Sequence, residues 1–150
     1  MKITVHMAVE ADELFESLIK SVLYDIEQAT GKHLPADRLK KGYSYKKVLK
    51  AKAGGDRHVT TKITHLERPY RYAASFKSQE GVNIIDYQIE PCEDGGIDVH
   101  YEEAFSSQKA LTDLNGKLTG AIYSWSAKRQ MKKRFKQMET FIKQERDKEE

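Results

Sequence analysis

The chain has 150 residues, with 26 Lys and Arg against 23 Asp and Glu, a formal net charge of +3 and a single cysteine, Cys92. This length fits one domain, and the lack of any run of about 20 apolar residues excludes a transmembrane helix. One cysteine excludes an internal disulfide and makes a metal site built on cysteines unexpected. Together with a start that lacks the order of a signal peptide, it predicts a cytoplasmic protein.

The first thirty residues show two different hydrophobic periods. Residues 2–9 place Ile3, Val5 and Met7 on one side, which predicts a half-buried strand. From residue 11 to residue 28, apolar side chains recur at steps of three and four. This spacing predicts a helix with a wide apolar face. Gly31 is expected to end that helix.

Five further segments alternate between apolar and polar residues and are separated by Gly-rich or Pro-containing turns. The predicted strands are 43–51, 58–66, 70–76, 83–89 and 97–105. Because the connections are short, consecutive strands are expected to pair as antiparallel neighbours.

The last predicted element is a helix over residues 118–142, whose apolar stripe includes Trp125, Phe135 and Met138. Its other face is strongly basic, from Lys128 to Lys136. Residues 127–150 hold nine Lys and Arg against five Asp and Glu, a balance of +4, which leaves −1 for the rest of the chain. The order strand, helix, five strands, helix predicts an α+β fold in which a curved antiparallel sheet wraps around the long C-terminal helix. We expect one domain over residues 1–143 and a frayed charged tail over 144–150.

With these elements in place, the chain resembles the helix-grip superfamily of START-like and polyketide-cyclase-like (SRPBCC) domains. It resembles more closely an uncharacterised bacterial family of similar length within that fold. The residues that carry the resemblance are Val9-Glu10-Ala11-Asp12, the run from Ser21 to Gly31, Leu39 to Tyr45 with Gly42-Tyr43-Ser44-Tyr45, Tyr87 to Pro91, Val99 to Glu103, Leu114 to Leu118 and the basic closing helix. The resemblance implies a hydrophobic ligand between the last helix and the sheet, and in some relatives cyclisation or hydrolysis there.

Alternation places an unusually polar set of side chains on the sheet face that should meet the last helix. The set comprises Tyr43, Tyr45, Lys47, Thr61, His65, Tyr70, Tyr72, Tyr87, Tyr101 and Glu103. Tyrosines can line the pocket of an amphipathic ligand, or their rings can simply fill the core. The ligand-binding candidates are Tyr45, Lys47, His65, Tyr72, Tyr87, Tyr101 and Glu103, with Trp125 from the helix.

Glu103 is the candidate catalytic residue, because a carboxylate among apolar neighbours needs a partner, for which Lys47 or His65 is in phase. As an acid or base it would suit an enzyme of the cyclase or hydrolase type, although Glu103 at a wet strand end is the alternative. The histidines are not spaced for a metal, Cys92 is interpreted as a bystander, and no cofactor is expected. The basic helix face could bind nucleic acid or an acidic partner, but a solvated face is the preferred interpretation. The expected partner is a hydrophobic or amphipathic small molecule.

Overall fold

The computed structural model describes residues 1–50, 55–106 and 116–149, with side chains of the last segment described from residue 125 onward. The elements in chain order are β1 (Lys2–Met7), α1 (Ala11–Thr30), the 3-10 turn η1 (Ala36–Arg38), β2 (Ser44–Leu49), β3 (Arg57–Glu67), β4 (Arg71–Ser78), β5 (Gly81–Pro91), β6 (Ile97–Ser106) and α2 (Gly116–Glu149).

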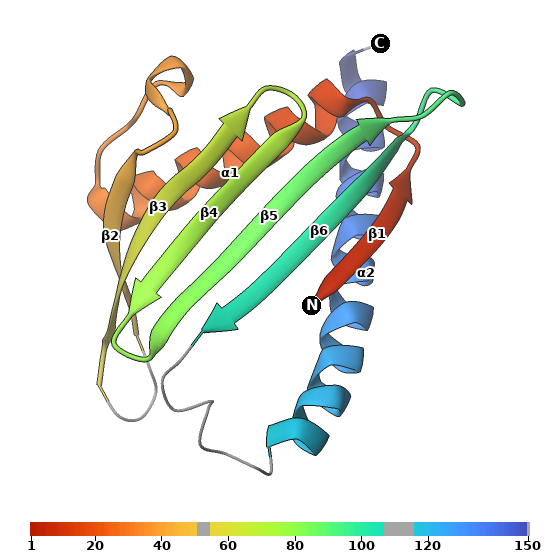
Figure 1. The fold of residues 1–150 in the computed structure, drawn as a ribbon. Coiled ribbons are helices and arrows are strands. Elements are labelled where there is room, and N and C mark those ends of the chain that lie inside the picture. The colour runs from red at the N-terminus through yellow and green to blue at the C-terminus, as the bar shows by residue number, and fades with distance from the viewer. Residues whose placement is uncertain (51–54, 107–115, 150) are drawn as a thin grey trace.

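The six strands form one antiparallel sheet in the order β1-β6-β5-β4-β3-β2, and both helices lie on the same side of it (Figure 1). The meander of β2 to β6 is the predicted one, and β1 closes the sheet by pairing with β6. The predicted α+β fold, a curved antiparallel sheet with a long C-terminal helix, is therefore confirmed.

Helix α1 begins with reciprocal hydrogen bonds between Glu10 and Glu13, since the Glu10 backbone N–H donates to the Glu13 carboxylate at 2.9 Å. It ends at Gly31, as predicted, where a left-handed backbone with φ of 70° brings the glycine N–H to the Glu27 carbonyl. The apolar face of α1 is buried against the sheet. The buried residues are Leu14, Phe15, Leu18, Ile19, Val22 and Ile26.

Helix α2 reaches the core through Met131, Phe135 and Ile142, which are buried in one cluster with the apolar face of α1. The expectation that Trp125 also faces the core is wrong, because its side chain is 64% exposed. The indole lies instead 5.7 Å from the Arg129 guanidinium one turn along the helix. Spacing along a helix shows which residues share a face but not which of its turns meet the sheet.

The helix continues beyond residue 143 to Glu149, and Arg146 Nε donates to the Glu13 carboxylate of α1 at 2.9 Å. This ion pair lowers the pKa of Glu13. It joins the end of the last helix to the beginning of the first. Among the described residues, no helix is long and apolar enough to cross a membrane.

Candidate ligand site on the concave face of the sheet

Three tyrosines form a row across the middle of the concave face. Register pairs Tyr72 of β4 with Tyr87 of β5, and Tyr87 with Tyr101 of β6. The ring centroids of neighbours are 5.8 and 4.9 Å apart, and Phe135 of α2 meets Tyr87 and Tyr101 edge-on at 6.0 and 5.7 Å. All three tyrosines are buried, so at this level the rings fill the core.

Burial is the main cause that raises the pKa of each tyrosine in the row, and the pKa of Tyr87 reaches about 12. Their hydroxyls keep their protons at neutral pH, and that of Tyr101 donates to the Glu103 carboxylate at 3.0 Å. The row is therefore an uncharged, packed part of the concave face, and any ligand must bind beside it.

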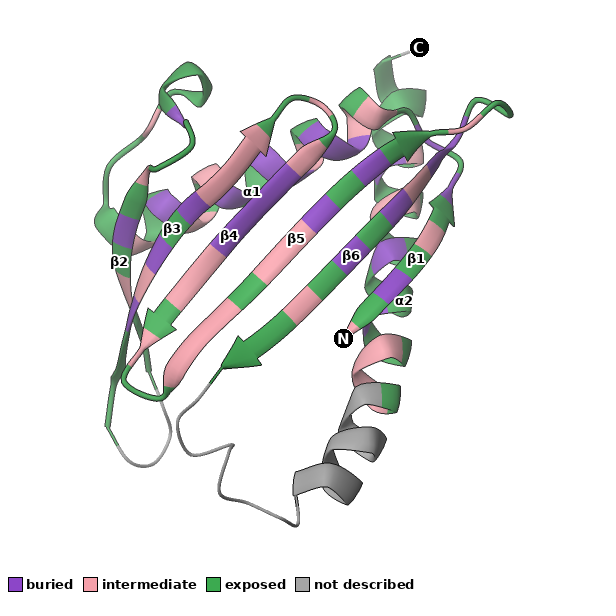
Figure 2. Ribbon diagram, viewed as in Figure 1, coloured by how far each residue is buried: buried purple, intermediate pink, exposed green. Residues whose placement is uncertain are grey.

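The concave face opens toward the far ends of the same strands. Phe76 of β4, Asn83 of β5 and Phe105 of β6 are paired in register four residues beyond the tyrosine row. Phe105 is 57% exposed, and these three side chains line a hollow of about 390 Å³ together with Lys47 and Val59. Figure 2 shows burial falling from the part of β4 to β6 nearest α1 toward these ends. The open hollow thus lies on the same face as the packed row, four residues further along the strands.

Glu103 lies between the row and the hollow, half-buried, and its carboxylate accepts a hydrogen bond from the Tyr101 hydroxyl at 3.0 Å. The expectation that Lys47 or His65 pairs with it is wrong. Lys47 is bound elsewhere, and His65 faces the opposite side of the sheet because β3 carries an irregularity between Ile63 and His65. One additional residue in a strand reverses the alternation that follows it.

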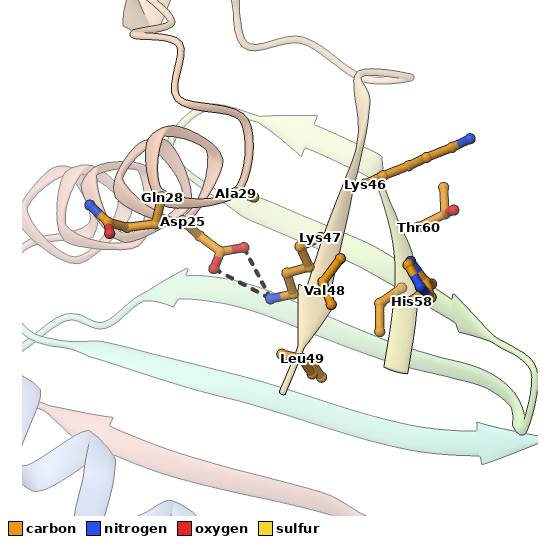
Figure 3. Close-up of a pocket in the computed structure, with 10 residues that line it drawn as sticks. Asp25, Gln28, Ala29, Lys46, Lys47, Val48, Leu49, His58 and Thr60 are labelled. Atoms are coloured by element: carbon orange, nitrogen blue, oxygen red, sulfur yellow. Dashed lines mark hydrogen bonds and ion pairs between the residues drawn. The ribbon is translucent and has the colours of Figure 1, made fainter. Parts of the chain in front are cut away.

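The actual partner of Lys47 is Asp25 of α1, which the sequence analysis did not single out. Lys47 Nζ lies 3.1 and 3.3 Å from the two Asp25 carboxylate oxygens (Figure 3). The Tyr45 hydroxyl donates to the same carboxylate. Burial and this carboxylate raise the pKa of Tyr45. The signal for Asp25 was its position three residues after buried Val22, at the border of the apolar face.

Lys47 stands between two hollows. It lines the concave one and also a second, of about 550 Å³, that lies between α1 and the β2–β3 edge and includes Gln28, His58 and Thr60 (Figure 3). The ion pair with Asp25 fixes the ammonium group at this border. It can offer a charged contact at the rim of the concave hollow without lying in its floor.

The predicted site residues therefore separate into groups. Tyr72, Tyr87, Tyr101 and Glu103 are brought together, and Tyr45 and Lys47 form a second cluster with Asp25. His65, Trp125 and Tyr70 do not join either group, because His65 is on the other face and the latter two are exposed. The Thr61 hydroxyl is buried and has no hydrogen-bond partner among the described residues.

Comparison with known proteins assigns the family but no activity. A family model described as "Domain of unknown function (DUF3284)" matches residues 1–124. The chain belongs to the DUF3284 family. This agrees with the expected uncharacterised family. No significant match to this DUF3284 chain occurs among curated proteins.

Solved structures similar to this DUF3284 chain share its fold at low sequence identity. A protein of unknown function from Staphylococcus aureus has 16% identity and a TM-score of 0.67, covering 98% of this chain and 96% of its own. A protein from Rhodobacter sphaeroides has 18% identity and a TM-score of 0.61, covering 94% and 89%. Ara h 8.0201 has 13% identity and a TM-score of 0.59, covering 95% of each chain, and represents the Bet v1-like form of the helix-grip fold.

Proposed function

We propose that this DUF3284 protein is a cytoplasmic, START-like binding protein that holds a hydrophobic or amphipathic small molecule between its sheet and α2. The observation that carries the proposal is the open concave hollow, which is lined by Phe76, Asn83 and Phe105 and lies four residues beyond the packed tyrosine row on the same face of the sheet. Its volume of about 390 Å³ suits a small organic molecule. The Bet v1-like fold commonly binds hydrophobic ligands, which supports the same class.

The distribution of polar groups favours an amphipathic ligand over a purely apolar one. An apolar or aromatic part would lie on Phe76 and Phe105, where exposed carbon surface otherwise meets water. Polar parts would meet Lys47 at the β2 side and Asn83 on β5. Glu103, two residues before Phe105 on the same face of β6, would supply a hydrogen-bond acceptor on the side of the tyrosine row.

The test begins with native mass spectrometry of the purified full chain, which detects retained small molecules and gives their masses. An amphipathic fluorescent probe, anilinonaphthalene sulfonate, is then titrated into the native protein. Replacing Phe105 by Ser removes half of the aromatic floor at an exposed position, so we expect probe affinity to fall at least about tenfold while the melting temperature changes little.

Ile84 provides the matched control. It is also an exposed apolar residue, 44% exposed, and it lies one strand away but on the convex face, since alternation places it opposite Ile85. Ile84→Ser should leave probe affinity unchanged. If both variants lose probe affinity equally, or both keep the wild-type affinity, the probe does not occupy the concave hollow.

A second candidate, an enzyme that uses Glu103 as an acid or base, is favoured by one specific contact. The Tyr101 hydroxyl orients the half-buried Glu103 carboxylate, as a general acid or base requires. The same mass spectrometry separates the two functions. If the wild-type protein converts the retained compound and the Glu103→Gln variant only binds it, the protein is an enzyme. If the wild-type protein leaves the compound unchanged, it is a binding protein.

A further inference from the structure

Three side chains of metal-binding type meet on the convex side of the sheet edge, away from the concave hollow. They are His6 of β1, Cys92 at the end of β5 and Asp98 of β6, and their ligand atoms all lie within 4.8 Å of one another. His6 Nδ1 is 2.9 Å from Asp98 Oδ1 and 4.0 Å from Cys92 Sγ. Pairing of β1 with β6 places His6 directly opposite Asp98.

The turn between β5 and β6 packs closely against the His6 ring. The Cys92 N–H donates to the Gly96 carbonyl at 2.8 Å, and the Gly96 N–H donates to Asp94 Oδ1 at 2.9 Å. A Cβ atom on Gly96 would lie 2.7 Å from the Met7 carbonyl and 3.1 Å from two atoms of the His6 ring. Only glycine permits this approach, so the backbone holds Cys92 near His6 before any ligand arrives.

Asp94 is placed to orient the histidine. Its second carboxylate oxygen lies 3.2 Å from His6 Nε2, so Nε2–H can donate to Asp94 while Nδ1 faces Cys92 and Asp98. Histidines that bind metals usually donate their other N–H to a carboxylate, which fixes the ring and the tautomer. Asp94 would act as a positioning residue and not as a ligand.

We propose that His6, Cys92 and Asp98 bind a divalent cation of the zinc class, with a water molecule in the fourth position. One imidazole nitrogen, one sulfur and one carboxylate oxygen match the ligands that Zn²⁺ prefers, whereas Mg²⁺ and Ca²⁺ select oxygen atoms alone. Asp94 and Glu90 add negative charge around the three ligands. The nearby His100 is already engaged, since its Nε2 lies 3.0 Å from Glu90 Oε2.

Binding requires that protons leave the site. The hydrogen bond to Asp98 raises the pKa of His6, and desolvation with the surrounding carboxylates raises the pKa of the Cys92 thiol. Because the cation binds the deprotonated ligands, any proton on His6 Nδ1 and the thiol proton of Cys92 are released to solvent, and the Asp98 carboxylate binds without losing one. The bound ion would tie the edge strand β1 to the β5–β6 turn.

The test uses the full chain, stripped with a chelator and returned to metal-free buffer at about pH 7.5. Zinc chloride is titrated by calorimetry, and cobalt chloride by absorption, because a thiolate bound to Co²⁺ gives an intense near-ultraviolet charge-transfer band. We expect one ion per chain. Cys92→Ser should abolish the band, and both Cys92→Ser and His6→Gln should weaken zinc binding at least about tenfold.

His100→Gln is the matched control, because His100 is an exposed histidine on the same face of β6, two residues from Asp98 and outside the proposed ligand set. It should bind zinc within about twofold of wild type. Asp94→Asn should weaken zinc binding by about 10- to 100-fold while the charge-transfer band persists at saturation, which separates positioning from ligation. Melting curves of the metal-free variants verify that each is folded. No band in wild type, or zinc affinity that survives Cys92→Ser, would overturn the site.

Discussion

At the residue scale, two carboxylates on opposite sides of the concave face are each held by a tyrosine hydroxyl. Asp25 accepts from Tyr45, and Glu103 accepts from Tyr101. Burial raises the pKa of both tyrosines, so each remains a donor and fixes one carboxylate oxygen. Asp25 is also neutralised by Lys47, whereas Glu103 has no ion-pair partner among the described residues. Glu103 is therefore the carboxylate better placed to interact with a ligand.

His6 gives a pH-dependent prediction at the same scale, for the metal-free protein. Its pKa is raised above 6.5, mainly because Asp98 accepts its hydrogen bond. A raised pKa stabilises the fold fully below the unfolded value of about 6.5, and that contribution disappears as pH rises through the folded value. His6→Gln should therefore lower the free energy of unfolding more at pH 5.5 than at pH 8.5. Asp98, with a lowered pKa, stays charged across this window.

Urea denaturation with a chelator present, at both pH values, measures the difference. His58→Gln is the control, because His58 is exposed on β3 and has no ion pair among the described residues. Its effect on the free energy of unfolding should be small. A loss in His6→Gln that does not depend on pH would mean that the ion pairs of His6 with Asp98 and Asp94 do not stabilise the protein.

At the scale of single elements, local periodicity predicted the helices and strands, but their contacts depended on features that it does not encode. The irregularity between Ile63 and His65 moved His65 to the other face, because a bulge leaves no signal in an alternating sequence. The exposure of Trp125 followed from which turns of α2 reach the sheet. By contrast, Tyr72, Tyr87 and Tyr101 were predicted to share a face, and their strict alternation in uninterrupted strands explains why.

Helix α2 itself offers a comparison between two phenylalanines. Phe135 is fully buried against Tyr87 and Tyr101, whereas Phe141, under two turns later, is 56% exposed. Phe135→Ala should cost about 3–5 kcal/mol of unfolding free energy through lost burial and a cavity, and Phe141→Ala less than about 1 kcal/mol. Urea denaturation measures both. Similar losses of unfolding free energy in the two variants would contradict the packing of Phe135, and not Phe141, on the tyrosine row.

At the scale of the whole molecule, the order of elements predicted an α+β fold with a curved antiparallel sheet and a long C-terminal helix, and the resemblance to known domains implied its helix-grip form. The pairing of β1 with β6 completes the sheet order and also brings together side chains that lie far apart in the sequence. It brought His6 beside Cys92 and Asp98, more than 80 positions away in the chain. No spacing rule detects such a cluster, because its residues become neighbours only through long-range strand pairing.

Charge is also distributed unevenly over the folded molecule. Toward the end of α2, Lys143, Arg146 and Lys148 pair with Glu139, Glu13 and Glu145. Earlier in the helix, Lys132, Lys133 and Lys136 are exposed and have no ion-pair partner among the described residues. The excess positive charge predicted from the sequence therefore lies on one solvated stretch of α2, where a polyanion could approach it.

We expect this stretch to give only weak, non-specific binding to nucleic acid. Electrostatic binding through a few lysines weakens steeply with salt, so a labelled 20-base duplex should bind at about 20 mM salt and not measurably at about 150 mM. Lys132→Glu with Lys133→Glu should abolish the low-salt binding. Lys46→Glu with Lys62→Glu makes the same change in net charge on exposed positions of the sheet and should reduce it much less. Fluorescence anisotropy measures all three proteins. Binding that persists at about 150 mM salt and is lost only in the helix variant would make nucleic acid the partner of this face, because salt-resistant affinity requires contacts beyond phosphate neutralisation.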